Sequence, residues 1–106
     1  MSDEIIVLVT ASNEEEASAI AEAVVNERLA ACVNILPGVE SVYRWEGRVE
    51  RGREFLLIIK STAGRYGALE QRVKELHSYS TPEVVAIRIE TGSSDYLAWL
   101  RDSTQG

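Results

Sequence analysis

A long pair of extended segments, residues 29–60, constrains the fold of this 106-residue chain more than any other feature. A polar residue followed by Gly at Glu46-Gly47, between two β-prone segments, predicts a hairpin, because Gly adopts the positive φ of a tight turn without strain. A first strand over residues 32–45 would span roughly 45 Å, against roughly 17–20 Å for a typical strand. Pro37-Gly38 and Arg51-Gly52 each predict an irregularity that bends the ribbon. A small domain cannot cover a ribbon this long, so its far end must bend or find a partner.

The segments before the hairpin predict a strand and a helix. Residues 5–9 form a short apolar run, which is typical of a strand in the middle of a sheet. Ser12 with Glu15 three residues later predicts a capping box at the start of a helix that runs to about Arg28. The apolar face of this helix comprises Ala17, Ile20, Ala21, Val24, Val25 and Leu29.

The segments after the hairpin predict a second helix, a strand and a short last helix. Residues 61–64 are expected to be a loop that leads into a helix over residues 65–76. Pro82 prevents further helix, and residues 84–89, most of which are β-branched, predict a strand. Ser93 or Ser94 is the expected cap of the last helix.

The resulting order, β-α-β-β-α-β followed by a helix, predicts an α+β fold of the ferredoxin-like type. This fold has a four-stranded antiparallel sheet with two helices on one face, and we expect one domain over residues 1–106. The other face of the sheet would be bare in a monomer.

Composition excludes some classes of function. The net charge of −6 and the pI of about 4.8 argue against nucleic-acid binding, which needs a basic surface. The arginines near the hairpin turn alternate with glutamates and indicate a charge-balanced, solvated ribbon. The single cysteine fits a reducing compartment, and the N-terminus has neither a signal peptide nor a membrane span, so a cytoplasmic protein is expected. No enzyme signature is found, and we expect no catalytic activity.

Four phrases of the sequence carry a resemblance to a known family: ERLAACVNILPGVESVYRWEG (residues 27–47), IIKS (58–61), ELHSYSTPEVVAI (75–87) and SSDYLAWL (93–100). Together they resemble the CutA divalent-cation tolerance family. The resemblance implies a homotrimer in which three sheets pack around an axis and each long hairpin reaches a neighbouring subunit. It also implies a role in tolerance to divalent cations, with copper(II) bound by some members.

Three residues are candidate metal ligands, namely His77, Glu83 and Cys32. His77 is the only histidine, and imidazole is a good ligand for copper. The family's copper site is associated with a first-strand cysteine and two adjacent histidines, whereas this chain has Val9 and Leu76 at two of those positions and keeps only His77. We therefore expect weak copper(II) binding at subunit interfaces and no metal needed for folding. Alternatively, His77 caps the second helix and Cys32 packs as a small buried hydrophobe.

A second set of residues from the same phrases could line a polar pocket between subunits. They would recognise a small anionic ligand or a partner protein, which makes a trimeric signalling module the alternative function. A simpler alternative is that Lys60 and Glu83 form an interfacial ion pair while aromatic side chains fill the interface. The candidate pocket residues are Lys60, Tyr79, Thr81, Glu83 and Trp45.

Overall fold

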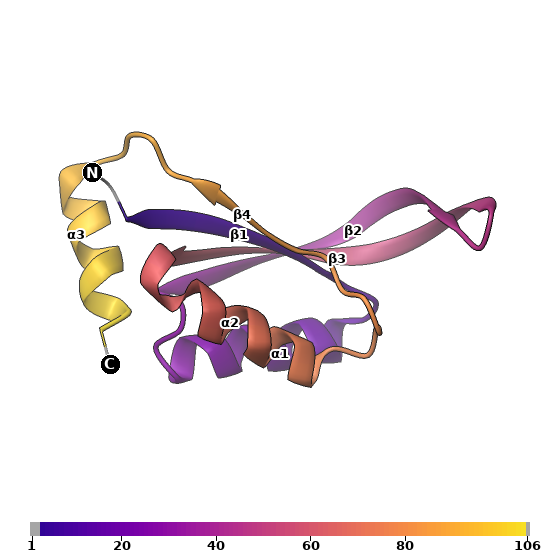
Figure 1. Ribbon diagram of the computed structural model, residues 1–106, viewed down its shortest axis with the longest axis horizontal. Coiled ribbons are helices and arrows are strands. Elements are labelled where there is room, and N and C mark those ends of the chain that lie inside the picture. Colours follow the sequence, from indigo (N-terminus) through magenta and orange to yellow (C-terminus); the bar gives the residue numbers. More distant parts are fainter. Residues whose placement is uncertain (1–2, 106) are drawn as a thin grey trace.

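The computed structural model describes residues 3–105 and has the expected α+β ferredoxin-like architecture (Figure 1). One antiparallel sheet has the strand order β2-β3-β1-β4. Helices α1 and α2 lie against one face of this sheet, and α3 lies at the end of the molecule opposite the hairpin turn. No helix among the described residues is long and apolar enough to cross a membrane. The elements are β1 (Glu4–Ala11), α1 (Glu14–Asn26), β2 (Cys32–Trp45), β3 (Arg48–Thr62), α2 (Ala63–Leu76), β4 (Val84–Arg88) and α3 (Ser94–Ser103).

The hydrophobic core lies between the sheet and the two long helices. Residues directly opposite one another in an antiparallel pair share a face, so the fully buried Val7 with Ile59, and Val9 with Leu57, define the face under the helices. The helices contribute residues at the predicted spacing. Those with no exposed surface are Ala17, Ile20, Val24, Leu69 and Val73.

Helix α1 begins and ends one or two residues away from the predicted positions. Its N-cap is Asn13, not Ser12, and the Asn13 side chain accepts a hydrogen bond from the Glu16 amide at 2.8 Å. The predicted N-cap was therefore out by one residue, and the reciprocal bond of a capping box does not form, because Glu16 Oε1 accepts from the Ser78 amide instead. At the other end, Arg28 adopts φ 60°, which ends the helix before the predicted boundary. Leu29 is buried, as predicted, but it lies after the end of the helix and not on its apolar face.

The expected loop over residues 61–64 does not exist. Strand β3 continues to Thr62, and α2 begins at the next residue, Ala63. Ser61 explains part of the difference, because its hydroxyl is buried and donates to the Leu29 carbonyl oxygen at 2.6 Å, a contact that keeps this polar residue inside the sheet. The last strand, Val84–Arg88, ends one residue earlier than predicted, and Ser93 is the N-cap of α3.

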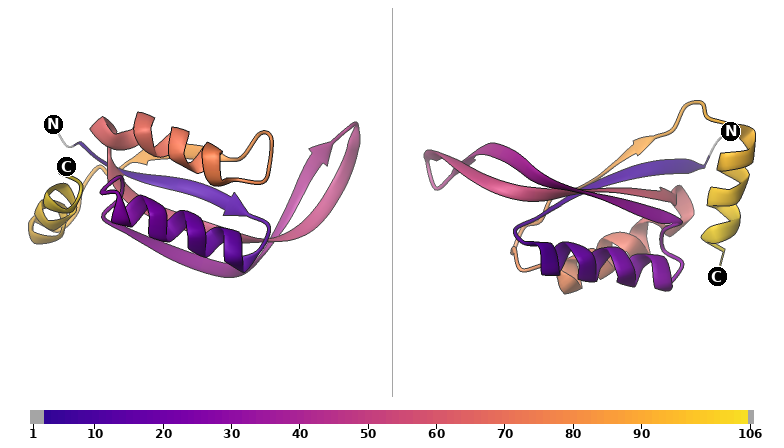
Figure 2. Two further views of the ribbon diagram at one scale, coloured as in Figure 1. Left: turned by 90° about the horizontal axis from the view of Figure 1, so that it is seen from below. Right: turned by 180° about the vertical axis from the view of Figure 1, so that it is seen from behind.

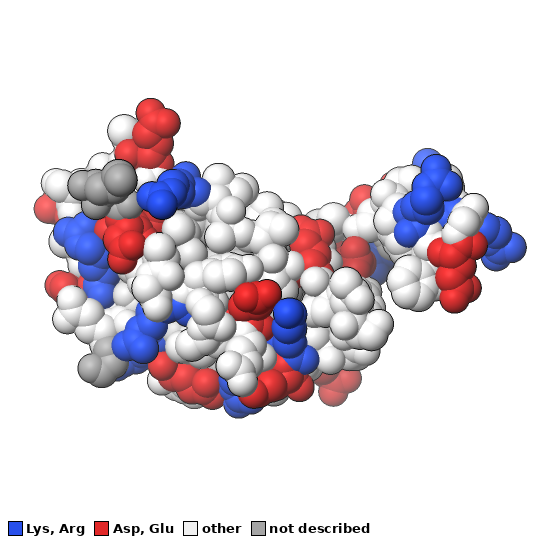
Figure 3. All heavy atoms as spheres, in the orientation of Figure 1, with Lys and Arg blue, Asp and Glu red and all other residues white. Residues whose placement is uncertain are grey.

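The outer part of the β2–β3 hairpin, residues 37–54, leaves the body of the molecule and is called the arm below (Figure 2). The pairing of β2 with β3 shifts between Leu36 and Val39, and Gly38 there has φ 71°, so the predicted bend at Pro37-Gly38 is confirmed. The predicted irregularity at Arg51-Gly52 was wrong, because Gly52 pairs with Ser41 in unbroken register. The Tyr43 ring lies over Gly52, and its hydroxyl would be in ordinary van der Waals contact, at 3.7 Å, with an added Cβ. Positive and negative side chains both gather at the tip of the arm (Figure 3).

The sheet face opposite α1 and α2 carries a set of apolar side chains, several of which are exposed. Cross-strand pairs place Ile6 beside Ile87 and Leu8 beside Val85 on this face. Val85 and Ile87 have 47% and 53% of their surface exposed. We call this surface the open face, and its apolar members are Ile6, Leu8, Leu36, Leu56, Ile58, Val85 and Ile87.

Candidate functional site

His77 follows the last residue of α2, and its ring is completely buried against β1. Its Nε2 lies 2.6 Å from the Thr10 carbonyl oxygen, and because a carbonyl only accepts, Nε2 is the donor. Its Nδ1 accepts from the Tyr79 amide at 3.0 Å. Both ring nitrogens therefore hold backbone groups of the same chain. His77 is the C-cap residue of α2, as the alternative interpretation expected, although its ring bonds backbone groups of Thr10 and Tyr79 and not the carbonyl groups of the helix.

Glu16 completes the surroundings of His77 and was not predicted as a site residue. Its Oε1 accepts from the Ser78 amide at 3.0 Å, and its Oε2 lies 3.5 Å from Nδ1 of His77. This Oε2 atom is buried and has no hydrogen-bond partner among the described residues. The sequence placed Glu16 in the first turn of α1 but gave no signal that its side chain would reach a loop that lies 62 residues later.

Tyr79 links the His77 region to the arm. Its ring packs on His77 with 4.6 Å between the ring centroids, and its hydroxyl donates to Glu54 Oε2 at 2.7 Å. The other oxygen of Glu54 accepts from the Ser41 hydroxyl at 2.6 Å. Partial burial, and then the bond to Glu54, raise the pKa of Tyr79 to about 12. The phenol is therefore a proton donor throughout the neutral range.

Cys32 and Lys60 lie far from His77, toward the end of the sheet that carries α3. They face each other across β2 and β3, and Lys60 is opposite Ile6, whereas His77 contacts Thr10 four residues further along β1. The Lys60 ammonium donates to the side-chain oxygen of Asn34. The Cys32 sulfur lies 3.6 Å from the Tyr96 hydroxyl, and this bond, followed by burial, raises the pKa of Tyr96 to about 12.

The remaining candidate residues are exposed. Thr81 and Glu83 lie in the segment between α2 and β4, and Trp45 ends β2 at the tip of the arm with 55% of its surface exposed. No group of three potential His, Cys, Asp or Glu ligands lies together within residues 3–105. A single chain therefore does not bring His77, Glu83 and Cys32 together, and Lys60 and Tyr79 belong to different ends of the sheet.

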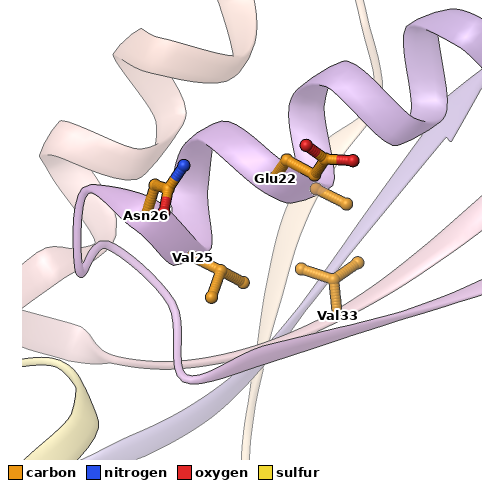
Figure 4. A pocket seen from close by; sticks show the side chains of 5 residues that line it. Glu22, Val25, Asn26 and Val33 are labelled. Carbon is orange, nitrogen blue, oxygen red and sulfur yellow. The ribbon is translucent and has the colours of Figure 1, made fainter.

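A shallow hollow of about 330 Å³ lies between α1 and β2, and none of the predicted site residues lines it. Figure 4 shows Val25 and Val33 facing each other across it, with the polar side chains of Glu22 and Asn26 at its rim. Ala21 completes the lining. The hollow has no cationic, thiol or imidazole group, so it offers neither a copper site nor an anion site.

Comparison with known proteins identifies the relatives of this chain. The family profile described as "CutA1 divalent ion tolerance protein" matches residues 5–103. The divalent-cation tolerance protein CutA of Thermus thermophilus is 52% identical over 99 residues, which cover 93% of this chain and 96% of that protein. The human Protein CutA is 43% identical over 97 residues, which cover 92% of this chain but only 54% of the human protein. The chain thus spans about half the length of this longer relative.

Solved structures agree with the sequence comparison. The Thermus thermophilus divalent cation tolerance protein superposes with a TM-score of 0.94 at 51% identity, covering 96% of this chain and 99% of that one. CutA1 from Oryza sativa superposes with a TM-score of 0.95 at 47% identity, covering 98% of this chain and 95% of the rice chain. The predicted resemblance is therefore confirmed, and the chain belongs to the CutA1 divalent ion tolerance family.

Proposed function

We propose that the chain acts in divalent-cation tolerance as a homotrimer in which the open faces of three sheets pack together. Family membership supports the tolerance role. The observation that supports the assembly is the open face itself. Its half-exposed Val85 and Ile87 continue across β1 to Ile6 and Leu8, and contiguous apolar surface of this kind marks an interaction site.

The exposed apolar residues of the arm support the same proposal. Val42, Trp45 and Val49 have 55%, 55% and 65% of their surface exposed, although they belong to strands. A two-stranded ribbon is marginally stable in water without a hydrophobic face packed against something. Contact of each arm with a neighbouring subunit would provide that packing.

We further propose that the trimer binds copper(II) weakly at its subunit interfaces. Because three potential ligands do not meet within the described part of one chain, a neighbouring subunit would have to contribute to the coordination. The candidate ligands are His77, Glu83 and Cys32. Coordination by His77 would also require one ring nitrogen to release the Tyr79 amide or the Thr10 carbonyl.

Calorimetric titration with copper(II) tests this part of the proposal. The wild type is compared with Glu83→Gln, Cys32→Ser and His77→Asn, since Asn keeps a side-chain oxygen that can accept from the Tyr79 amide. A variant that lacks a copper ligand should bind copper(II) with lower affinity than the wild type, while its circular dichroism spectrum should match that of the wild type. Isotherms identical to the wild type would remove a residue from the ligand set, and no saturable binding by the wild type would reject copper binding altogether.

Lys60 favours a second candidate function, recognition of a small anion or an acidic partner between subunits. Its ammonium is bonded to the neutral side chain of Asn34, and no carboxylate within residues 3–105 is close enough to form an ion pair with it. It also lies on the open face beside Ile6. Thermal unfolding in the presence of nucleotides and organic acids is the test, because a ligand that binds only the folded state raises the melting temperature. A rise that Lys60→Gln abolishes supports this function, whereas no rise with any anion rejects it.

A further inference from the structure

The arm needs a contact with the body if it is to leave the sheet in one fixed direction. The shift in pairing between Leu36 and Val39 interrupts the ladder where the arm begins. A bulge bends the strand and leaves a residue outside the ladder, so pairing between β2 and β3 does not by itself fix the angle between the arm and the sheet. A side-chain contact across this point would fix it.

Glu54 makes that contact. It pairs with Val39, so it lies on the arm side of the bulge and directly next to it. Each of its carboxylate oxygens accepts one hydrogen bond. The donor to Oε1 is Ser41, which belongs to the arm, and the donor to Oε2 is Tyr79, which belongs to the body. Within residues 3–105, Tyr79–Glu54 is the only side-chain hydrogen bond or ion pair between the arm and any part of the chain outside β2 and β3.

The body side of this contact is firmly held. The Tyr79 ring packs on the buried His77, and the Tyr79 amide donates to the same imidazole. His77 is bonded in turn to the Thr10 carbonyl of β1, and the neighbouring Ser78 amide donates to Glu16 of α1. The phenol is therefore tied to both the sheet and a helix. Its raised pKa keeps its proton available for Glu54.

We propose that Glu54, clamped between Ser41 and Tyr79, sets the direction in which the arm leaves the sheet and so positions it for docking on a neighbouring subunit. Hydrogen bonds to a carboxylate are about twice as strong as those between neutral groups. The bond from Tyr79 to Glu54 is therefore strong enough to hold the arm at a fixed angle to the sheet. The docking half of the inference rests on the proposed homotrimer, whereas the fixed direction is a property of one chain.

The distance between the arm and the body tests the clamp. Spin labels on cysteines introduced at Arg48 in the arm and Ala68 in α2, in a Cys32→Ser background, report this distance by pulsed electron paramagnetic resonance. The labelled protein is diluted into excess unlabelled protein so that distances within one subunit dominate. Tyr79→Phe keeps the ring packing and removes only the hydroxyl, and Tyr96→Phe is the matched control because its phenol lies beside position 32, at the start of β2, and not beside the arm.

We expect one narrow distance distribution for the wild type and Tyr96→Phe, and a broadened or shifted one for Tyr79→Phe and Ser41→Ala. A distribution for Tyr79→Phe that matches the wild type would overturn the clamp. Sedimentation of the same samples separates the two proposals. A monomeric wild type would reject the trimer while the distances still decide the clamp, and a trimer with an unchanged Tyr79→Phe distribution would reject the clamp alone.

Discussion

Tyr79 and Tyr96 are the two residues in which local surroundings change acid–base behaviour most clearly. Burial is the larger cause for Tyr79, and the bond to Cys32 is the larger cause for Tyr96. Both effects favour the protonated phenol, because burial penalises the anion and the hydrogen bonds would be lost or weakened on ionisation. The two side chains lie near opposite ends of the sheet, so each can be altered without direct effect on the other.

In an alkaline titration, Tyr79 and Tyr96 should therefore ionise at a higher pH than an ordinary tyrosine, and the free energy of unfolding should fall as they ionise. With pKa values raised from 10.0 to about 12 in the folded state, both groups contribute stability that is fully present below pH 10 and is lost as the pH rises toward 12. Phenolate absorbance should show a late step that shrinks in Tyr79→Phe and again in Tyr96→Phe. All four tyrosines titrating together near pH 10 would contradict this expectation.

As a histidine, His77 suggests metal binding, but both of its ring nitrogens bond backbone groups and give it a structural role. His77→Ala should lower the free energy of unfolding by up to roughly 1–3 kcal/mol for each part-buried backbone group that it leaves without a partner. Those groups are the Thr10 carbonyl and the Tyr79 amide. His77→Asn can still accept from the Tyr79 amide and should lose less. Urea denaturation at one fixed chain concentration measures both, and equal stability of His77→Ala and the wild type would show that the two bonds contribute nothing.

Glu16 and Glu54 mark the limit of sequence analysis at this scale. The position of Glu16 in the first turn of a helix follows from local charge preference, and that of Glu54 follows from the charged ribbon. Their partners, Ser78 and Tyr79, lie far away in sequence and are brought to them only by tertiary packing. The sequence analysis selected His77 and Tyr79 as candidate site residues, but it did not select Glu16 and Glu54, the carboxylates that lie beside them.

At the scale of elements, hydrophobic periodicity predicted every helix and strand, and the errors lie at their ends. The junction of β3 with α2 was predicted as a loop because Ser61 and Thr62 are polar, yet both are buried. The partner of Ser61 is the carbonyl of Leu29 from a distant segment, which no local pattern contains. The turn and the bend of the hairpin were predicted correctly, since strong local signals, Glu46-Gly47 and Pro37-Gly38, fix them.

Two glycines should respond in opposite ways to the same substitution. Gly47 has φ 79° in the hairpin turn, so Gly47→Ala should lower the free energy of unfolding by about 1–2 kcal/mol. Gly67 lies inside α2 with nothing within 4 Å of an added Cβ, so Gly67→Ala should raise it by about 0.5–1 kcal/mol. Urea denaturation of the two variants at equal chain concentration compares them. Effects of the same sign would show that the backbone conformation at these positions does not decide stability.

At the scale of the whole molecule, the arm and the open face raise the same question of what covers them. The molecule measures 44 × 25 × 22 Å, and its long axis follows the hairpin past the edge of the body (Figure 1). The sequence predicted the long ribbon and the bare sheet face from strand length and the order of elements. It could not predict the direction of the arm, because that direction depends on the contact of Glu54 with a loop on another part of the chain.

A single charge on the open face should distinguish a packed interface from a solvated surface. In the proposed homotrimer, Val85→Asp would bury a carboxylate in each subunit without a partner, and an isolated buried charge costs several kcal/mol. Symmetry repeats the cost in every subunit, so the variant should sediment as a monomer where the wild type sediments as a trimer. Ala68→Asp adds the same charge to the exposed side of α2 and should leave the trimer intact. If Val85→Asp and Ala68→Asp both sediment as trimers, the open face is not the interface, and the exposed arm would be the remaining surface through which the subunits could assemble.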